Sequence, residues 1–344
     1  MKNSVVVTGA TSGIGYAICE ALLDSGYPII GIGRSEDSCS AAKASLEASR
    51  PGTKVHFIAA DFMLQREVLR VAREIESSMT NCGGRIHALI NNAGCVRSRF
   101  MTTEEGYEQQ FALNHLAGFL LTHKLMPLIK RDNTAVIFTS SSSHKNICVN
   151  WDDLMYQKMY NPLYAYKQSK LCNLLTAHRL REMGVRAVGV DPGLVRTEIG
   201  NKDTDGVVDI VWNLRKKYGI LPEESAQIYL SLCEDGFSGL YYGASRHLNQ
   251  KPGPGSEKQS FAANVQYRMK NAKSWASGTL QSITPGDSKS EGQEPGEFRS
   301  VERRTSNQVT SANARRLYEI SMKLCGIDTK QSKNNEENSK HGYL

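Results

Sequence analysis

The stretch Val5-Val6-Val7-Thr8-Gly9-Ala10-Thr11-Ser12-Gly13-Ile14-Gly15 decides the fold of this chain. Its apolar start predicts a buried strand, and the apolar residues that follow it recur at helical spacing. Glycines between strand and helix allow a tight turn that lets the backbone approach a pyrophosphate, and the helix N-terminus offers free N–H groups. An ordinary tight turn is the alternative, but the position favours a dinucleotide site. We expect the cofactor to contact Gly9, Ser12, Gly13, Ile14 and Gly15.

Strands and helices continue to alternate up to about residue 243. Apolar runs occupy 4–8, 28–33, 55–60, 86–91, 134–140, 185–190 and 239–243. Runs that are apolar throughout, such as Ala135-Val136-Ile137-Phe138, are typical of parallel strands covered on both faces. Helical patterns lie between them, including 103–130, 163–183 and one that starts at Pro222. The pattern predicts an α/β fold: a Rossmann-type doubly wound parallel sheet of about seven strands in three α/β/α layers.

The composition divides the chain into four parts. Residues 1–248 are expected to form the dinucleotide-binding catalytic domain, with a substrate lid near 194–220. Residues 249–310 are rich in glycine, proline, serine and charge, which predicts a flexible insertion. A terminal helix at 311–326 is expected to pack on the domain, and 327–344 reads as a polar tail.

Bulk properties exclude several classes of protein. The net charge of +7 is spread along the chain rather than gathered in a stripe, so no nucleic-acid partner is expected. No apolar run reaches the roughly 18 residues of a membrane span, and an apolar run directly follows residues 1–4, so we expect neither a membrane span nor a signal peptide. The eight cysteines and eight histidines are scattered, so we expect reduced thiols, no metal site and a cytoplasmic protein.

The end of the second strand indicates which dinucleotide is bound. A carboxylate there suits the ribose 2′-hydroxyl of NAD, whereas an arginine suits the 2′-phosphate of NADP. The sequence is Gly31-Ile32-Gly33-Arg34-Ser35, which favours NADP(H) because a guanidinium pairs well with phosphate. Glu36 and Asp37 follow closely, so NAD(H) stays an alternative.

One tyrosine has a lysine four residues further along: Tyr166 and Lys170, in Tyr166-Lys167-Gln168-Ser169-Lys170. On a helix this spacing puts both side chains on one face. Free tyrosine loses its proton only near pH 10, and a fixed cation beside it favours the phenolate. The pair is therefore a candidate general acid/base.

These motifs together resemble the short-chain dehydrogenase/reductase family, in its single-domain branch. They occur in the family's order: the glycine turn, Asp61 after the third strand, Asn91-Asn92-Ala93-Gly94 after the fourth, Asn114 in a long helix, a serine run, Tyr166-x-x-x-Lys170, and Asp191-Pro192-Gly193 with Thr197. The resemblance covers roughly residues 4–245. The Trp151-Asp152-Asp153-Leu154 stretch and the terminal helix are most similar to retinol-dehydrogenase-like members.

The resemblance implies a role for each matching residue. Asp61 would bond the adenine amino group, Asn92, Ala93 and Gly94 would line the cofactor, and Pro192, Gly193 and Thr197 would meet its nicotinamide end. Lys170 would hold the nicotinamide ribose and stabilise the phenolate of Tyr166. Tyr166 would exchange a proton with the substrate oxygen.

Two further catalytic residues follow from the resemblance. In retinol-dehydrogenase-like members the catalytic serine is the second of a pair ending the strand, which selects Ser141 from the run 140–143, with Ser140 as the second choice. Asn114 would bind a water that links Lys170 to solvent. A helix-interior asparagine bonded to a backbone carbonyl is the structural alternative for Asn114.

The expected function is an NADP-dependent oxidoreductase that interconverts an alcohol and a carbonyl. Residues 199–220 would form the lid, and Val207, Val208, Ile210, Val211, Trp212 and Leu214 favour an apolar aldehyde or ketone. The alternatives are a catalytically weak dinucleotide sensor or scaffold, and an epimerase or dehydratase of the extended branch. The resemblance also implies a homodimer or homotetramer that pairs through the helices at 104–130 and 163–183.

Overall fold

The structure of the protein is a computed structural model that describes residues 2–196, 219–244 and 300–327. These residues belong to one compact unit. No helix within the described ranges is long and apolar enough to cross a membrane.

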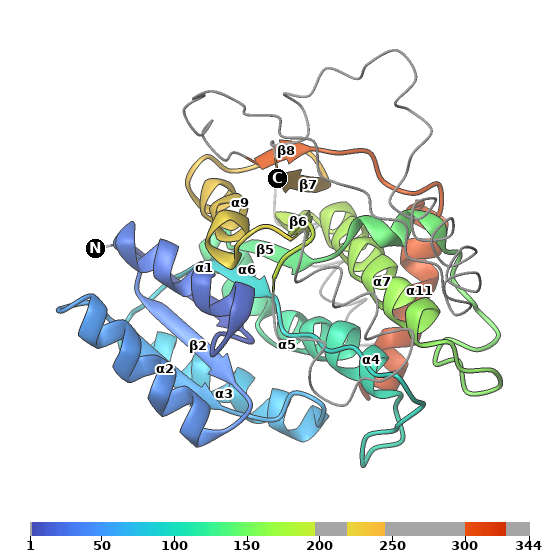
Figure 1. Cartoon of the computed structure of the whole chain (residues 1–344), viewed down its shortest axis with the longest axis horizontal. Helices are drawn as coiled ribbons and strands as arrows, with labels where there is room; N and C mark the ends of the chain where they lie inside the picture. Colours follow the sequence, from blue (N-terminus) through green and yellow to red (C-terminus); the bar gives the residue numbers. More distant parts are fainter. Residues whose placement is uncertain (1, 197–218, 245–299, 328–344) are drawn as a thin grey trace, which may run out of the picture. The chain divides into compact units, whose positions relative to one another are not determined.

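One eight-stranded sheet runs through this unit in the order β3-β2-β1-β4-β5-β6-β7-β8 (Figure 1). The strands from β1 to β7 are parallel, and β8 is antiparallel to β7. The chain proceeds from β1 to β2 on one side and returns to β4 on the other, which places a ligand crevice at the carboxyl ends of these strands. The strands are β1 (Ser4–Thr8), β2 (Ile29–Gly33), β3 (Val55–Ala59), β4 (Ile86–Asn91), β5 (Ala135–Thr139), β6 (Ala187–Asp191), β7 (Tyr241–Ala244) and β8 (Ser300–Glu302).

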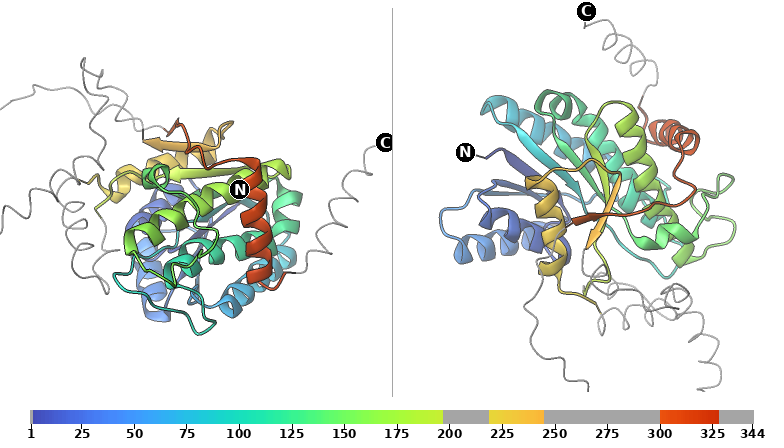
Figure 2. Two further views of the ribbon diagram at one scale, coloured as in Figure 1. Left: turned by 90° about the vertical axis from the view of Figure 1, so that its right-hand side faces the viewer. Right: turned by 90° about the horizontal axis from the view of Figure 1, so that it is seen from above.

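Helices cover both faces of the sheet, which confirms the doubly wound three-layer fold (Figure 2). One layer holds α1 (Gly13–Asp24), α2 (Glu36–Ser49) and α9 (Pro222–Glu234), and the other holds α3 (Gln65–Asn81), α5 (Ala117–Lys124) and α7 (Pro162–Glu182). Every residue of β2, β5 and β6 is buried, as their apolar runs predict. Helix α3 buries Val68, Val71, Ala72 and Ile75, whose spacing forms one apolar stripe.

The predicted helix at 103–130 is interrupted and begins later than expected. It consists of α4 (Gln109–Phe111), a π-helical turn η1 (Ala112–Leu116), α5 and α6 (Met126–Asp132). Residues 103–107 instead make a tight turn, in which the N–H of Gly106 donates to the carbonyl of Thr103 at 2.9 Å. Glu108 then starts the helix, because its carboxylate accepts from the N–H groups of Gln110 and Phe111.

Strand β8 also departs from the prediction. It lies inside 249–310, the segment expected to be a flexible insertion, and it gives the sheet an eighth strand. A three-residue strand preceded by a polar stretch carries too little periodicity to be recognised from the sequence.

The terminal helix α11 (Ser311–Leu324) packs along α7 (Figures 1 and 2). Its Tyr318 ring meets Phe119 of α5 edge-on at 5.1 Å between centroids and lies 5.9 Å from the Arg179 guanidinium of α7. This helix therefore covers part of the α5 and α7 surface through which a second copy was expected to pair.

Acidification is expected to destabilise the protein, because two histidines beside α11 are held as neutral rings. Burial lowers the pKa of His115 to about 4, and burial, together with the nearby charge of Lys124, lowers the pKa of His123 to about 4. In the unfolded chain both take up a proton near pH 6.5. The contribution of these two neutral rings to the free energy of unfolding is therefore fully present above pH 6.5. It is lost as the pH falls towards 4, by at most about 3 kcal/mol for each ring.

Urea unfolding at pH 7.5, 5.5 and 4.5 measures this loss. The substitution His123→Gln keeps a hydrogen-bonding side chain opposite the Tyr318 hydroxyl, which lies 3.3 Å from His123 Nδ1. The variant should show a shallower dependence of the unfolding free energy on pH. An unchanged dependence would rule out His123 as a source of the acid sensitivity.

Candidate active site

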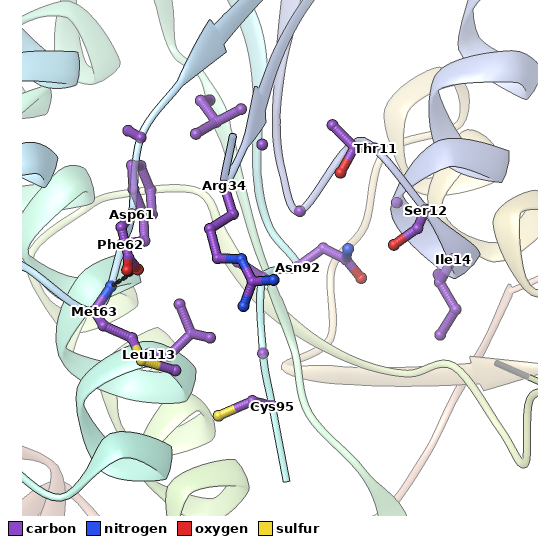
Figure 3. A pocket seen from close by; sticks show the side chains of 18 of the residues that line it. Thr11, Ser12, Ile14, Arg34, Asp61, Phe62, Met63, Asn92, Cys95 and Leu113 are labelled. Carbon is purple, nitrogen blue, oxygen red and sulfur yellow. Dashed lines mark hydrogen bonds between the residues drawn. The ribbon is translucent and has the colours of Figure 1, made fainter. Parts of the chain in front are cut away.

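A cavity of about 420 Å³ opens at the carboxyl ends of β1, β2, β3 and β4 (Figure 3). It brings together predicted residues that are widely separated in the sequence. They are Gly9, Ser12, Gly13, Ile14, Gly15, Arg34, Asp61, Asn92, Ala93 and Gly94. The cavity therefore lies where the glycine turn predicts a dinucleotide.

The glycine turn is packed so closely at Gly15 that a side chain does not fit there. A Cβ on Gly15 would lie 2.0 Å from the carbonyl oxygen of Gly9, and Gly9 itself has a φ of +67°. The turn leads into the N-terminus of α1, whose N-cap residue Ser12 makes no side-chain capping bond. Free N–H groups and the positive end of the helix dipole thus face the cavity, which suits a pyrophosphate.

The charged side chains that line the cavity are mostly positive. Arg34 is exposed at the end of β2 and its guanidinium points into the cavity (Figure 3). Arg97 and Arg196 also line the wall, whereas Asp61 is the one lining carboxylate among the described residues. Glu36 and Asp37 lie in the first turn of α2 and do not line the cavity. This distribution suits a ligand with several phosphates.

Asn92 and Thr8 join the central strands beneath the cavity. The Thr8 hydroxyl oxygen accepts from the N–H groups of Asn92 and Ala93, both at 2.9 Å. The Asn92 side chain donates to the Thr8 carbonyl at 3.2 Å and accepts from the Thr139 hydroxyl at 3.3 Å. These bonds connect the ends of β1, β4 and β5, so Asn92 steadies the cavity floor as well as lining it.

Asp61 and its neighbours form the wall opposite the glycine turn (Figure 3). The carboxylate oxygen Oδ1 accepts from the N–H of Met63 at 3.0 Å, which fixes the orientation of the side chain. Phe62, Met63 and Leu113 add apolar surface on the same side. A carboxylate beside apolar walls suits a flat ring that carries an amino group.

Tyr166 and Lys170 lie on α7; neither lines the cavity, but Lys170 lies next to Gly94, which does. The Lys170 ammonium lies 5.6 Å from the centroid of the Tyr166 ring, so the predicted pair does share one helix face. Lys170 is buried, and its Nζ donates to the Thr139 carbonyl at 3.1 Å. A Cβ on Gly94 would lie 3.5 Å from this Nζ. This is an ordinary van der Waals distance, and it places the lysine nitrogen next to a residue that lines the cavity.

Asn114 lies in the π-helical turn η1 and is buried. Its side-chain oxygen accepts from the N–H of Cys95 at 2.7 Å, and its amide donates to the Cys95 carbonyl and to the Ser169 hydroxyl, both at 3.0 Å. The side chain thus ties the segment after β4 to α7. A single π turn within a helix often marks a functional position.

The serine run separates into different environments. The Ser140 hydroxyl donates to the Lys170 carbonyl at 2.8 Å, so it holds α7 against β5. The Ser141 hydroxyl accepts from the N–H and hydroxyl of Ser143, and the His144 ring bonds the Ser141 carbonyl at 2.6 Å. The Ser140 hydroxyl is thus bonded to the main chain of α7, and the Ser141 hydroxyl is bonded within the turn that follows β5.

The segment after β6 is described only in part. Pro192 accepts through its carbonyl from the Ser225 hydroxyl at 2.9 Å, and Gly193 donates through its N–H to Asp191 at 3.1 Å with a φ of +82°. Thr197 and the predicted lid residues at 207–214 lie outside the described residues.

Several lining residues were not predicted from the sequence. They are Thr11, Ile32, Gly33, Ala60, Phe62, Met63, Cys95, Arg97, Leu113 and Arg196. Most are sequence neighbours of predicted residues. They could have been predicted because ligands of a parallel sheet bind at the carboxyl ends of its strands. Burial raises the pKa of the Cys95 thiol to about 12, which excludes a reactive thiolate there.

The comparisons with known proteins agree on one family. A family model described as short chain dehydrogenase matches residues 3–152. Retinol dehydrogenase 14 of Homo sapiens is 34% identical over 261 residues, which cover 70% of this chain and 78% of that protein. Polyprenol dehydrogenase of Homo sapiens is 30% identical over 205 residues, which cover 56% of this chain and 61% of that protein.

Solved structures share the fold. A short-chain dehydrogenase from Sphingobium yanoikuyae in complex with NADPH aligns with a TM-score of 0.55 at 20% identity. The alignment covers 83% of this chain and 99% of that chain.

Proposed function

Because the chain belongs to the short-chain dehydrogenase family and is a dehydrogenase acting on CH–OH groups, we propose that it interconverts an alcohol and a carbonyl with NADP(H), using Tyr166 as general acid/base. One observation carries this proposal. The buried Lys170 side-chain nitrogen lies 5.6 Å from the centroid of the Tyr166 ring and next to Gly94, which lines the cavity at the glycine turn.

The residues of the cavity fit NADP(H). The α1 N-terminus and the glycine turn would hold the pyrophosphate, Asp61 the adenine and Arg34 the 2′-phosphate. The rest of the dinucleotide, including its nicotinamide end, would contact Asn92, Ala93, Gly94, Pro192, Gly193 and Thr197. The bound dinucleotide supplies or accepts the hydride, and the protein supplies position and charge.

The remaining residues would move and stabilise the proton. Lys170 would hold the nicotinamide ribose, and its side-chain nitrogen lies 5.6 Å from the centroid of the Tyr166 ring. Ser141 would hydrogen-bond the substrate oxygen while Tyr166 gives or takes its proton. Asn114 is proposed to hold the water that connects Lys170 to solvent. Its side-chain oxygen already accepts from Cys95, so this water would bond another group of the π turn, such as a main-chain carbonyl.

We expect the substrate to be an apolar aldehyde, ketone or alcohol. Two relatives are named for retinol and polyprenol, which are both apolar alcohols. Phe100, Met101 and Met159 are 39%, 43% and 82% exposed on segments that follow β4 and β5 at the carboxyl edge of the sheet. Large exposed apolar side chains at this edge suit an apolar substrate. The cytoplasmic location and the oligomeric state remain predictions.

The substitution Arg34→Ala is expected to weaken NADPH binding by about 10- to 100-fold, because a charge-assisted hydrogen bond to phosphate contributes roughly 1.5–3 kcal/mol. NADH affinity should change by less than about threefold. Calorimetric titration of both cofactors measures the difference. Arg73→Ala removes one positive charge from an exposed position that does not line the cavity and serves as the control. Equal weakening of both cofactors would exclude Arg34 as the 2′-phosphate ligand.

A further inference from the structure

We propose that the terminal helix α11 positions Asn114, and with it the water proposed to link Lys170 to solvent. It does so through a buried hydrogen bond between Ser321 and His115. This proposal rests on the function proposed above, because it concerns Asn114, the neighbour of His115 in the chain. His115 and Ser321 are positioning residues here: neither lines the cavity, and they act through the π turn that they hold.

The bond itself is fully shielded from water. His115 Nε2 lies 2.9 Å from the Ser321 hydroxyl oxygen, and both residues have no exposed surface. A buried polar pair of this kind is costly to break, because each partner would be left without its hydrogen bond. The contact spans 206 positions of sequence, so it fixes the end of the chain against the middle of the domain.

Two consecutive residues of the π turn η1, Asn114 and His115, direct their side chains to different helices. Asn114 bonds the Cys95 backbone and Ser169 of α7, close to Gly94 and Lys170. His115 bonds α11 instead. A π turn is rare and persists where its surroundings hold it. The Ser321 contact is thus placed to keep η1 in the register that presents Asn114 to the active site.

Helix α11 is capped at its N-terminus and bonded to the rest of the domain at its C-terminus, so its position is fixed. Thr310 caps its N-terminus by accepting from the N–H of Asn313 at 3.3 Å. At its C-terminus the Leu324 carbonyl accepts from the Tyr107 hydroxyl at 2.7 Å and from the Gln65 amide at 3.1 Å. Tyr107 immediately precedes Glu108, the residue that caps α4 and so starts the helix that contains η1. These C-terminal contacts and the packing of α11 along α7 therefore fix Ser321 relative to the π turn.

The test compares two hydroxyl groups on the same helix. Ser321→Ala and the more nearly isosteric Ser321→Cys remove or weaken the bond to His115, and Ser321→Thr keeps a hydroxyl. Tyr318→Phe is the matched control, since it removes a hydroxyl that bonds His123 of α5 rather than the neighbour of Asn114. The full-length variants are assayed for kcat, its pH profile, KM for a carbonyl substrate and affinity for NADPH.

We expect Ser321→Ala and Ser321→Cys to lower kcat about 10- to 100-fold and to displace the pH profile of kcat, with NADPH affinity within about twofold of the parent. Ser321→Thr should recover most of the rate, and Tyr318→Phe should keep the parental rate and pH profile. The proposal is overturned if the Ser321→Ala and Ser321→Cys variants have the same kcat and pH profile as Tyr318→Phe. It is also overturned if the decrease in their kcat is fully explained by a smaller fraction of folded protein. Failure of the proposed function would appear separately, as undiminished turnover in Tyr166→Phe.

Discussion

Tyr166→Phe is expected to lower kcat by about 10²–10⁴-fold, the range that general acid–base catalysis contributes, and to leave NADPH affinity within about threefold of the parent. The phenylalanine keeps the ring beside the Lys170 ammonium and removes only the hydroxyl that would exchange the proton. The test measures the rate at which each variant reduces a panel of apolar aldehydes and ketones. NADPH binding is measured in parallel.

Tyr164→Phe is the matched control for this experiment. It removes the same group from the same helix two residues earlier, at a side chain that is 48% exposed. Its turnover should equal that of the parent. If Tyr166→Phe also turned over at the parental rate, Tyr166 would not be the acid/base. If the parent itself turned over no carbonyl while still binding NADPH, the sensor or scaffold alternative would be favoured.

The sequence predicts the layers of the fold well because its central strands, such as β5 and β6, are buried on both faces. Such strands appear in the sequence as continuous apolar runs, as in Ala135-Val136-Ile137-Phe138. Each predicted run from 4–8 to 239–243 overlaps a strand of the sheet. The positions of Gly9, Arg34, Asp61 and Asn92 at one cavity follow from the same reasoning, since parallel strands end at one edge.

Features that depend on single side-chain contacts could not be predicted in this way. The helix expected from 103 begins at 109 because the Glu108 carboxylate caps it, and a glutamate is not a typical N-cap residue. The π turn at 112–116 has the same apolar pattern as an ordinary helix. The pairing of β8 with β7, and of Ser321 with His115, joins residues far apart in the chain, and no local pattern encodes such contacts.

The substitution Gly15→Ala is expected to weaken NADPH binding by about 100-fold or more, although it adds a single methyl group. That methyl carbon would lie 2.0 Å from the Gly9 carbonyl oxygen and 2.7 Å from the Asn92 amide nitrogen. Neither neighbour is free to move, because Gly9 belongs to the turn and the Asn92 amide donates to the Thr8 carbonyl. The clash must therefore push the start of α1 away from β1, which removes its N–H groups from the pyrophosphate position.

Thermal unfolding and NADPH titration together separate this effect from simple destabilisation. Overpacking of this kind costs about 1–3 kcal/mol of stability, so the variant should still fold. Gly26→Ala is the control: Gly26 has a φ of +78°, but nothing lies within 4 Å of its Cβ position. It should lose about 1 kcal/mol of stability through backbone strain while keeping parental NADPH affinity. Loss of NADPH affinity in Gly15→Ala alone would locate the phosphate site at the α1 N-terminus, whereas unchanged affinity in both variants would place the dinucleotide elsewhere.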